Sequence, residues 1–320
     1  LLVQKADEQH WLVTGANGNL GRRFIGQTLS ATQDRIRAVV RSDRAAEQLA
    51  AANLITGQNA RLDVKVLDYT DEEALLEAAQ GCTRALHLVG ILKATKSATY
   101  AQAHEESAAA MAKVCDESSV QHLTYLSILG SSAESPNACL ASKGRAEEIF
   151  LRASTPACVL RVPMVLGEGD YASTALLRRA VQARSFAFRP QSMEQPIYAG
   201  DVIKAIEQAA RLEYAGGLDL AGAESLTREE LLQRAAKCMG QTTSVVGLPI
   251  TLGYALAATL QTFLPNPPLT AAMLGVLDHD DAIDPAPALQ ALQMPALSSV
   301  DATLARLHAT SANAGLKKED

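Results

Sequence analysis

The segment Thr14–Arg22 constrains the fold of this chain more than any other part of the sequence. It reads Thr-Gly-Ala-Asn-Gly-Asn-Leu-Gly-Arg, so that Gly15, Gly18 and Gly21 recur every third residue. A short, mostly apolar strand, His10–Thr14, runs into this turn, and apolar residues at near-helical spacing follow it. This order of strand, glycine turn and helix predicts the first unit of a dinucleotide-binding fold rather than a plain tight turn.

Glycine suits such a turn because it has no Cβ, so that backbone amides can approach a pyrophosphate closely. The helix that follows directs its positive N-terminus at the same phosphates. We therefore expect the nucleotide to contact Thr14, Gly15, Asn17, Gly18, Asn19, Leu20, Gly21 and Arg22.

Strand and helix patterns alternate along the next part of the chain. Strands are expected at Ile36–Val40, Leu62–Leu67, Ala85–Val89, Leu123–Ile128 and Ala157–Val165, and helices at Tyr100–Ser118 and Leu140–Ala153. Thr70 and Glu73 form a capping box that opens another helix, which Gly81 closes. This alternation predicts an α/β fold with a doubly wound parallel sheet.

The end of the second strand usually decides which nicotinamide cofactor binds. An acid there accepts hydrogen bonds from the ribose 2′-hydroxyl of NAD, whereas an arginine accommodates the extra phosphate of NADP. This strand ends in Arg41-Ser42, Asp43 should lie past the ribose, and Arg22 supplies a second positive charge. The sequence favours NADP(H) and leaves NAD(H) open, the alternative for Arg41 being a solvated surface side chain.

Two further pairs follow expected strands and are candidates for cofactor contacts. Asp68 and Tyr69 come after the third strand and are placed to meet the adenine. Val89 and Gly90 end the fourth strand and are placed to line the ribose. Both pairs are equally compatible with ordinary strand ends.

Composition excludes several classes of function. The net charge of −6 and the pI near 5.6 argue against broad binding to nucleic acid. The five cysteines are odd in number and lack metal-ligand spacing, so we expect no metal site and a reducing compartment such as the cytoplasm. The first residue is Leu, so a removed targeting sequence and a mitochondrial matrix location stay open.

No residue between Gln241 and Leu277 is charged. The run Val245–Leu264 is long enough to span a membrane, but glycine, proline, threonine and glutamine dilute it. A buried helix, or one lying on a membrane or partner surface, is the favoured interpretation. We therefore expect residues 245–270 to contact a partner or the periphery of an inner membrane.

The motifs together resemble those of the atypical, extended short-chain dehydrogenases/reductases over roughly residues 10–240. Besides the glycine turn, the resemblance rests on Leu126-Ser127, Ser142-Lys143-Gly144 with Glu147, Leu160–Pro163, and Gln195–Tyr198 before Asp201-Val202. More narrowly, His87–Leu92 and Pro267–Thr270 are similar to the branch that contains the dehydrogenase-like accessory subunit of respiratory complex I and its bacterial relatives.

The resemblance implies a dinucleotide-binding Rossmann domain over residues 1–165, to which residues 195–212 return. Residues 166–320 then form a smaller, mostly helical portion, with a substrate cleft between the two at the carboxyl ends of the strands. Pro163, Val165 and a loop at Tyr171 are expected to border the nicotinamide end of the cofactor.

Active members of the family use a serine, a tyrosine and a lysine. The tyrosine exchanges a proton with the substrate oxygen, the lysine lowers the pKa of the tyrosine and binds the nicotinamide ribose, and the serine orients the carbonyl. Here Ser127 and Lys143 align, but Cys139 stands four residues before Lys143, where the tyrosine belongs. A cysteine side chain is too short to reach the same oxygen, so the usual proton donor is missing.

Three functions stay open. The resemblance to the complex I branch implies a protein that binds NADP(H) as a structural or regulatory element, in respiratory or quinone-related machinery. A reductase or epimerase is the second, with its acid relocated to Tyr171, Tyr198, His104 or Cys139. Two of these residues also have a purely structural interpretation: Tyr198 would pack against the sheet, and His104 would lie on a solvated helix face. The third is an assembly protein that docks through its uncharged stretch.

Overall fold

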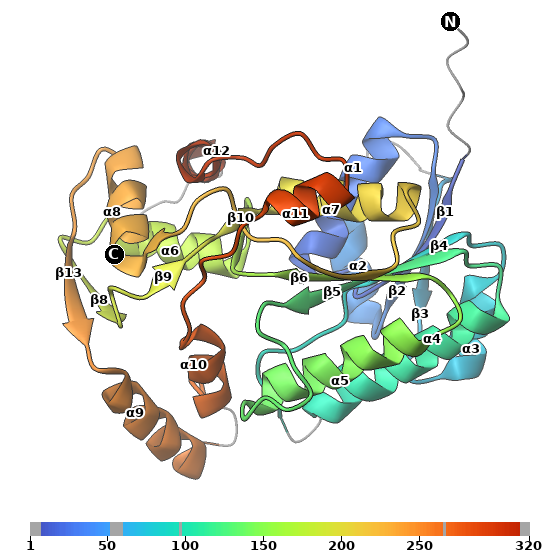
Figure 1. The fold of residues 1–320 in the computed structure, drawn as a ribbon, viewed down its shortest axis with the longest axis horizontal. Helices are drawn as coiled ribbons and strands as arrows, with labels where there is room; N and C mark the ends of the chain where they lie inside the picture. The colour runs from blue at the N-terminus through green and yellow to red at the C-terminus, as the bar shows by residue number, and fades with distance from the viewer. Residues whose placement is uncertain (1–7, 52–59, 96–97, 265–266, 314–320) are drawn as a thin grey trace, which may run out of the picture.

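The computed structural model describes residues 8–51, 60–95, 98–264 and 267–313. A seven-stranded, fully parallel sheet runs through its centre in the order β11-β6-β5-β4-β1-β2-β3 (Figure 1). The chain order reverses between β1 and β4, which places a crevice at the carboxyl ends of these two strands. The strands are β1 (His10–Thr14), β2 (Arg35–Val40), β3 (Leu62–Val66), β4 (Arg84–His87), β5 (His122–Ile128), β6 (Ala157–Val162) and β11 (Gly216–Asp219).

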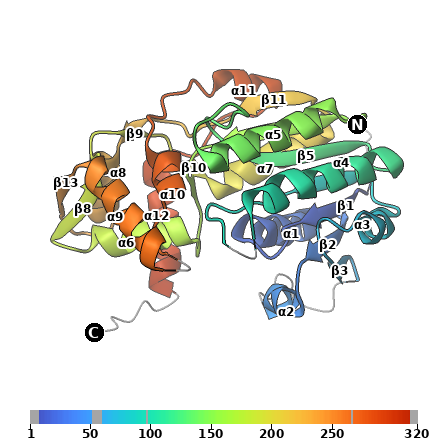
Figure 2. The same cartoon turned by 90° about the horizontal axis from the view of Figure 1, so that it is seen from below.

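Helices cover both faces of the sheet (Figures 1 and 2), which confirms the predicted doubly wound α/β fold. One face packs against α1 (Asn19–Ala31), α2 (Asp43–Ala51), α7 (Ala199–Arg211) and α11 (Ala286–Ala291). The other packs against α3 (Glu72–Ala79), the π-helix η1 (Ala101–Glu106), α4 (Ser107–Glu117) and α5 (Ala138–Arg152).

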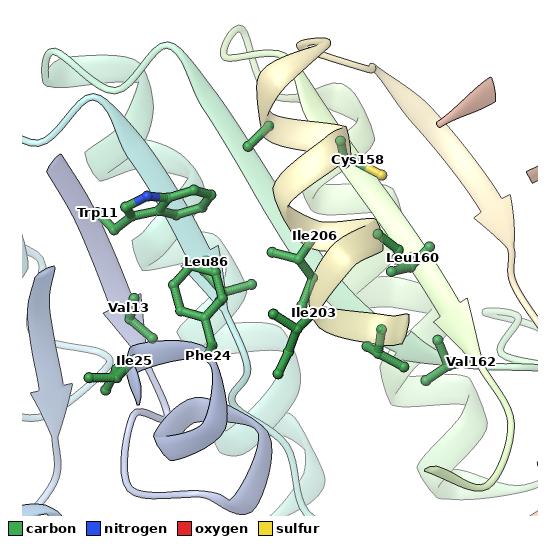
Figure 3. Close-up of a cluster of buried hydrophobic side chains, with 14 of the residues drawn as sticks. Trp11, Val13, Phe24, Ile25, Leu86, Cys158, Leu160, Val162, Ile203 and Ile206 are labelled. Carbon is green, nitrogen blue, oxygen red and sulfur yellow. The ribbon is translucent and has the colours of Figure 1, made fainter. Parts of the chain in front are cut away.

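The larger core cluster lies between the sheet and the helices α1 and α7 (Figure 3). Trp11 of β1 meets Phe24 of α1 edge to face, with ring centroids 4.9 Å apart. Ile203 and Ile206 of α7 fill the space beside Leu86. Burying each large apolar side chain contributes about 1.5–3 kcal/mol, so this cluster fixes α1, and with it the glycine turn, on the sheet.

The second part of the molecule has its own, smaller core. Leu177, Leu231 and Leu304 pack together from α6 (Tyr171–Ala180), α8 (Arg228–Cys238) and α12 (Val300–Asn313). Three short strand pairs complete it. They are β7 (Val165–Leu166) with β10 (Ile197–Tyr198), β9 (Met193–Glu194) with β12 (Leu226–Thr227), and β8 (Arg184–Phe188) with β13 (Ser244–Leu248).

The later part of the chain returns to the sheet three times. Helix α7 packs against β5, β6 and α1, strand β11 pairs with β6, and α11 adds Ala288 to the larger core cluster. The nucleotide-binding body is therefore built from segments on both sides of residue 165.

Two helices stand in the uncharged stretch, α9 (Ile250–Phe263) and α10 (Ala271–Leu277). Helix α9 buries Gly253 and Ala257, while Leu252, Leu256 and Phe263 on another side of it are exposed, Phe263 by 78%. None of the described helices is both long and apolar enough to cross a membrane.

Several predicted boundaries need correction. The side chain that caps α3 is Asp71, which accepts a hydrogen bond from the Ala74 amide, and not Thr70. The predicted strand over Ala157–Val165 is broken after Val162, where Pro163 has no N–H to continue the ladder. The predicted helix from Tyr100 to Ser118 begins as a π-helix. Helix α8 is capped by Thr227, whose hydroxyl accepts a hydrogen bond from the Glu230 amide.

Candidate functional site

The glycine turn has the backbone that a bound pyrophosphate requires. Gly15 has a φ of +73°, and a Cβ added there would lie 3.0 Å from the carbonyl carbon of Leu88. A Cβ added at Gly21 would lie 2.6 Å from the carbonyl oxygen of Ala16. Neither position admits a larger residue without movement of the backbone, so the turn stays tight against the start of α1.

No side chain of the described residues caps the N-terminus of α1. Its N-cap residue, Gly18, supplies no side-chain hydrogen bond, and the first turn of the helix contains no acidic residue. Asn17 and Asn19 are half-buried beside it, and Leu20 packs into the core. The free first-turn amides and the helix dipole form a ready site for phosphate, so the residues present fit a dinucleotide.

Arg41 lies at the end of β2 and is exposed. Its guanidinium carbon is 5.7 Å from the centre of the Tyr69 ring. The Tyr69 hydroxyl in turn accepts a hydrogen bond from the Gly15 amide at 3.2 Å and donates to the Val39 carbonyl at 3.3 Å. Among the described residues neither Arg41 nor Arg22 forms an ion pair, so both cations are available at this end.

Asp68 is engaged locally. Its carboxylate accepts hydrogen bonds from both the amide and the hydroxyl of Thr70 at 2.9 Å, and these bonds lower the pKa of Asp68. The carboxylate is therefore charged and already partnered.

The opposite end of the crevice is occupied by Lys143 of α5. Its ammonium donates to the Leu126 carbonyl at 3.0 Å and lies 4.5 Å from the centre of the Tyr125 ring. A Cβ added at Gly90 would be 3.0 Å from Nζ, so the Gly90 backbone lies directly beside the amine. Burial lowers the pKa of Lys143 to about 8.

Ser127 belongs to a buried ion-pair network. Its hydroxyl donates to the Glu147 carboxylate, which is paired with Arg161 at 2.7 Å. Arg161 also reaches Asp219 on β11. In the described part of the chain no hydrogen bond joins Ser127 to Lys143 or to Cys139.

Cys139 is fully buried at the start of α5. Its thiol donates to the Ile91 carbonyl at 3.6 Å, and burial raises the pKa of the thiol. Val276 of α10 packs against it, together with the side chains of Leu140, Tyr100 and Ile128.

Helix α10 is fastened over this position. The Asn137 side chain caps α5 by accepting from the Cys139 and Leu140 amides, and its Nδ2 donates to the Ala272 carbonyl at 2.9 Å. A Cβ added at Gly275 would lie 2.4 Å from Asn137 Nδ2, which shows how closely α10 approaches. We call the contacts of α10 with Asn137, Cys139 and Leu140 the α10 seal.

Comparisons with known proteins agree with this geometry. Residues 15–161 match the family described as NAD(P)H-binding. The chain is 24% identical over 283 residues to NADH dehydrogenase (ubiquinone) 1 alpha subcomplex subunit 9 of Arabidopsis thaliana, a mitochondrial protein, covering 85% of this chain and 68% of that protein. It is 24% identical over 241 residues to a protein named ceramide reductase from Caulobacter vibrioides, covering 74% and 73%.

Among solved structures, UDP-glucuronic acid 4-epimerase of Bacillus cereus, in complex with UDP-glucuronic acid and NAD, superposes with a TM-score of 0.72. The match covers 95% of this chain and all of the epimerase at 15% identity. The chain therefore has the fold of this epimerase, and residues 15–161 are similar to the NAD(P)H-binding family. The resemblance predicted from the motifs is thereby confirmed, including the similarity to the complex I branch.

The candidates for a relocated acid lie in different surroundings. His104 was expected on a solvated helix face, but it is 0% exposed, and it lies on the same side of its helix as the buried Ala108 and Met111. Its Nε2 accepts a hydrogen bond from the Ile91 amide at 3.0 Å, so this nitrogen carries no proton to donate.

In the described residues no hydrogen bond joins either tyrosine candidate to Lys143. Tyr198 is buried and donates to Glu168 at 2.9 Å, and Glu168 pairs with Arg23 of α1 at 2.6 Å. Tyr171 was expected in a loop but begins α6, with 90% of its surface exposed.

The remaining candidates beside the nicotinamide end are Pro163, between β6 and β7, and Val165, which pairs with Ile197.

Sequence reasoning missed the groups that hold this end together. Asn137 carries a usable signal, since asparagine before an apolar helix is a common N-cap. The contacts of Tyr100, Ile91 and Val276 carry no local signal, because they join segments far apart in the chain.

Proposed function

We propose that the protein binds NADP(H) as a structural or regulatory element and does not turn it over. The observation that carries the proposal is the α10 seal, which buries Cys139 at the position where active relatives have a tyrosine. A thiol that donates to a backbone carbonyl and has a raised pKa is not placed to protonate a substrate oxygen.

The preference for NADP(H) over NAD(H) is supported by charge. Arg41 and Arg22 stand near the glycine turn without carboxylate partners in the described residues, and no acid ends β2. A 2′-phosphate beside Arg41 would gain a charge-assisted hydrogen bond.

Lys143 remains useful without a tyrosine. Its ammonium lies beside Gly90 at the nicotinamide end, where it would donate to ribose hydroxyls. Retention of Lys143 and Ser127 therefore fits a protein that holds the nucleotide without reacting it.

The test combines identification of the nucleotide with a search for turnover. Protein purified without added cofactor is denatured, and the released nucleotide is identified by mass. The same protein is then mixed with NADPH and a panel of carbonyl compounds and quinones. We expect NADP(H) to be released and NADPH oxidation to stay at the background rate.

Release of no nucleotide, together with no affinity for added NADPH, would contradict binding. Steady oxidation of NADPH would contradict the structural role. Cys139→Tyr is informative here, since a gain of reductase activity would show that the site lacks only its acid. The matched control is Cys238→Tyr, at a half-exposed cysteine on α8.

Helix α9 supports docking on a partner or membrane as part of this role. It presents Leu252, Leu256 and Phe263 to solvent within a stretch that has no charged residue. The similarity to a subunit of NADH dehydrogenase favours a respiratory complex at an inner membrane as the partner. We expect Leu256→Lys to release the protein from the membrane fraction, while Ala258→Lys, at an exposed position away from the face of α9 that carries Leu252, Leu256 and Phe263, has a smaller effect.

A second function, an NADPH-dependent reductase, is favoured by the similarity to the ceramide reductase. It requires that the α10 seal opens and that another group supplies the proton. Oxidation of NADPH in the presence of a lipid carbonyl compound would favour it, and the panel above should include one.

A further inference from the structure

The segment Leu88–Leu92, here called the β4 loop, joins the two ends of the nucleotide site. Its first residues face the glycine turn, since a Cβ on Gly15 would touch the Leu88 carbonyl. Its middle faces Lys143, since a Cβ on Gly90 would lie 3.0 Å from the amine. The position of this loop therefore sets how Lys143 stands relative to a bound dinucleotide.

Side chains clamp the far end of the β4 loop. The Ile91 amide donates to His104 Nε2 at 3.0 Å, and the Ile91 carbonyl accepts from the Cys139 thiol at 3.6 Å. The Tyr100 hydroxyl donates to the Leu92 carbonyl at 2.9 Å. The near end is held by the backbone, where the Leu88 amide donates to Thr14.

His104 is the unusual member of this clamp. The π-helix that carries it is a rare conformation, and at its end the Ser107 amide donates to the Gln102 carbonyl, five residues earlier. The ring is stacked with Tyr100, with centroids 5.7 Å apart and planes at 28°, and it is fully buried.

The hydrogen bond from Ile91 also fixes the state of the ring. A backbone N–H can only donate, so Nε2 is unprotonated and the neutral ring carries its proton on Nδ1, which has no partner among the described residues. Burial, with the nearby Lys143 charge, lowers the pKa of His104 to about 3, so the ring stays neutral at physiological pH.

We propose that His104 is a positioning residue for the nicotinamide half of the dinucleotide. His104 accepts a hydrogen bond from the Ile91 amide. This bond holds the β4 loop in place, so that the Gly90 backbone stays next to Lys143. This inference rests on the proposed nucleotide binding and assigns His104 no part in proton transfer.

The test compares two ligands that differ only in the nicotinamide nucleoside. One is NADPH, and the other is 2′-phospho-ADP, which keeps the pyrophosphate but lacks both the nicotinamide and its ribose. His104→Phe keeps a ring stacked on Tyr100 but removes the acceptor, whereas the amide oxygen of His104→Gln can replace it. His122→Phe is the matched control. His122 is also buried and also bonds one backbone group, the Tyr214 carbonyl, but it lies at the start of β5, away from the β4 loop.

Isothermal titration is expected to show about a 10-fold rise in the Kd for NADPH in His104→Phe, the effect of losing one buried hydrogen bond. The Kd for 2′-phospho-ADP should change by less than about 2-fold. His104→Gln should recover most of the affinity for NADPH, and His122→Phe should change neither constant. A nucleotide-independent structural role would shift both ligands alike.

Equal changes for the two ligands, or no change, would overturn the role of His104. Should His104→Phe fail to fold, Gly90→Ala tests the same loop, since its added Cβ presses on the Lys143 amine. Gly90→Ala must then weaken NADPH selectively, and an unaltered ratio overturns the proposal. Binding of neither ligand by the wild type would instead contradict the proposed function itself.

Discussion

The two ends of the nucleotide crevice begin with the same kind of element, the N-terminus of a helix, and use it in opposite ways. Helix α1 has no side-chain cap, so its first amides and the exposed Arg41 are free for a ligand. Helix α5 is capped by Asn137, and the residues behind the cap are buried under α10.

The difference teaches that binding and turnover depend on separable parts of this fold. The glycine-turn end keeps everything that attracts phosphate. At the Lys143 end, the thiol of Cys139 and the ring of His104 are bonded to the β4 loop instead of facing a substrate. Four changes test this contrast, from the largest expected effect to the smallest.

Gly21→Ala should abolish nucleotide binding at the glycine turn. The new Cβ would meet the Ala16 carbonyl oxygen at 2.6 Å, so the turn must open. We expect the Kd for NADPH, measured by titration, to rise by about 100-fold or more. Gly217→Ala is the control, because its Cβ approaches only the flexible Arg161 guanidinium, at 3.4 Å. Unchanged affinity in Gly21→Ala would place the nucleotide elsewhere.

Arg41→Ala should weaken the binding of NADPH but not that of NADH. Loss of a charge-assisted bond to the 2′-phosphate costs about 1.5–3 kcal/mol, which is roughly a 10- to 100-fold rise in the Kd for NADPH. The Kd for NADH should stay within about 2-fold. Arg178→Ala, an exposed arginine on α6, controls for the loss of general charge. Parallel weakening of both cofactors would show that Arg41 does not contact the 2′-phosphate.

Val276→Asp should loosen the α10 seal. A carboxylate in the packing against Cys139 favours displacement of α10, so alkylation of Cys139, followed by peptide mass, should accelerate about 10-fold or more. Burial raises the pKa of Cys139, so labelling should also quicken with rising pH in both proteins. Ala271→Asp, at the exposed start of α10, is the control. Equal labelling of all three proteins would argue that α10 does not cover the thiol.

The smallest expected effect is the pH dependence of stability that comes from the lowered pKa of Lys143. This pKa is about 8 in the folded protein against an ordinary value of 10.5. Between these values the unfolded chain binds a proton that the folded protein has lost. The free energy of unfolding should therefore rise with pH in this window, by up to about 1.4 kcal/mol per pH unit. Below pH 8 both states are protonated, and the dependence disappears.

Urea unfolding of the wild type and of Lys143→Met at several pH values isolates this slope. The difference in free energy between the two proteins should move in favour of the wild type above pH 8. A constant difference across the range would mean that Lys143 keeps its ordinary pKa.

Local signals in the sequence were sufficient for the first half of the fold. Strand β1 has the predicted bounds, because an apolar run before a glycine turn has few alternatives. The capping error at α3 moved the cap by a single residue, since Thr70 and Asp71 are both good caps and only the backbone decides between them.

The closed end of the crevice could not be predicted in the same way. His104 was misplaced because its polarity favoured a solvated face, although it lies four and seven residues before the buried Ala108 and Met111, on the same side of the helix. Cys139 is buried together with Val276, which lies far along the chain, and the sequence near either residue contains no pattern that predicts this contact. Such tertiary contacts have no local pattern.

Strand β11 has a consequence for how the protein is made. Until Gly216–Asp219 has left the ribosome, β6 presents an unpaired edge, and α7 and α11 are also encoded late. Open strand edges invite association between nascent chains. The nucleotide-binding body is therefore expected to finish folding only after α11 has been made, long after its glycine turn.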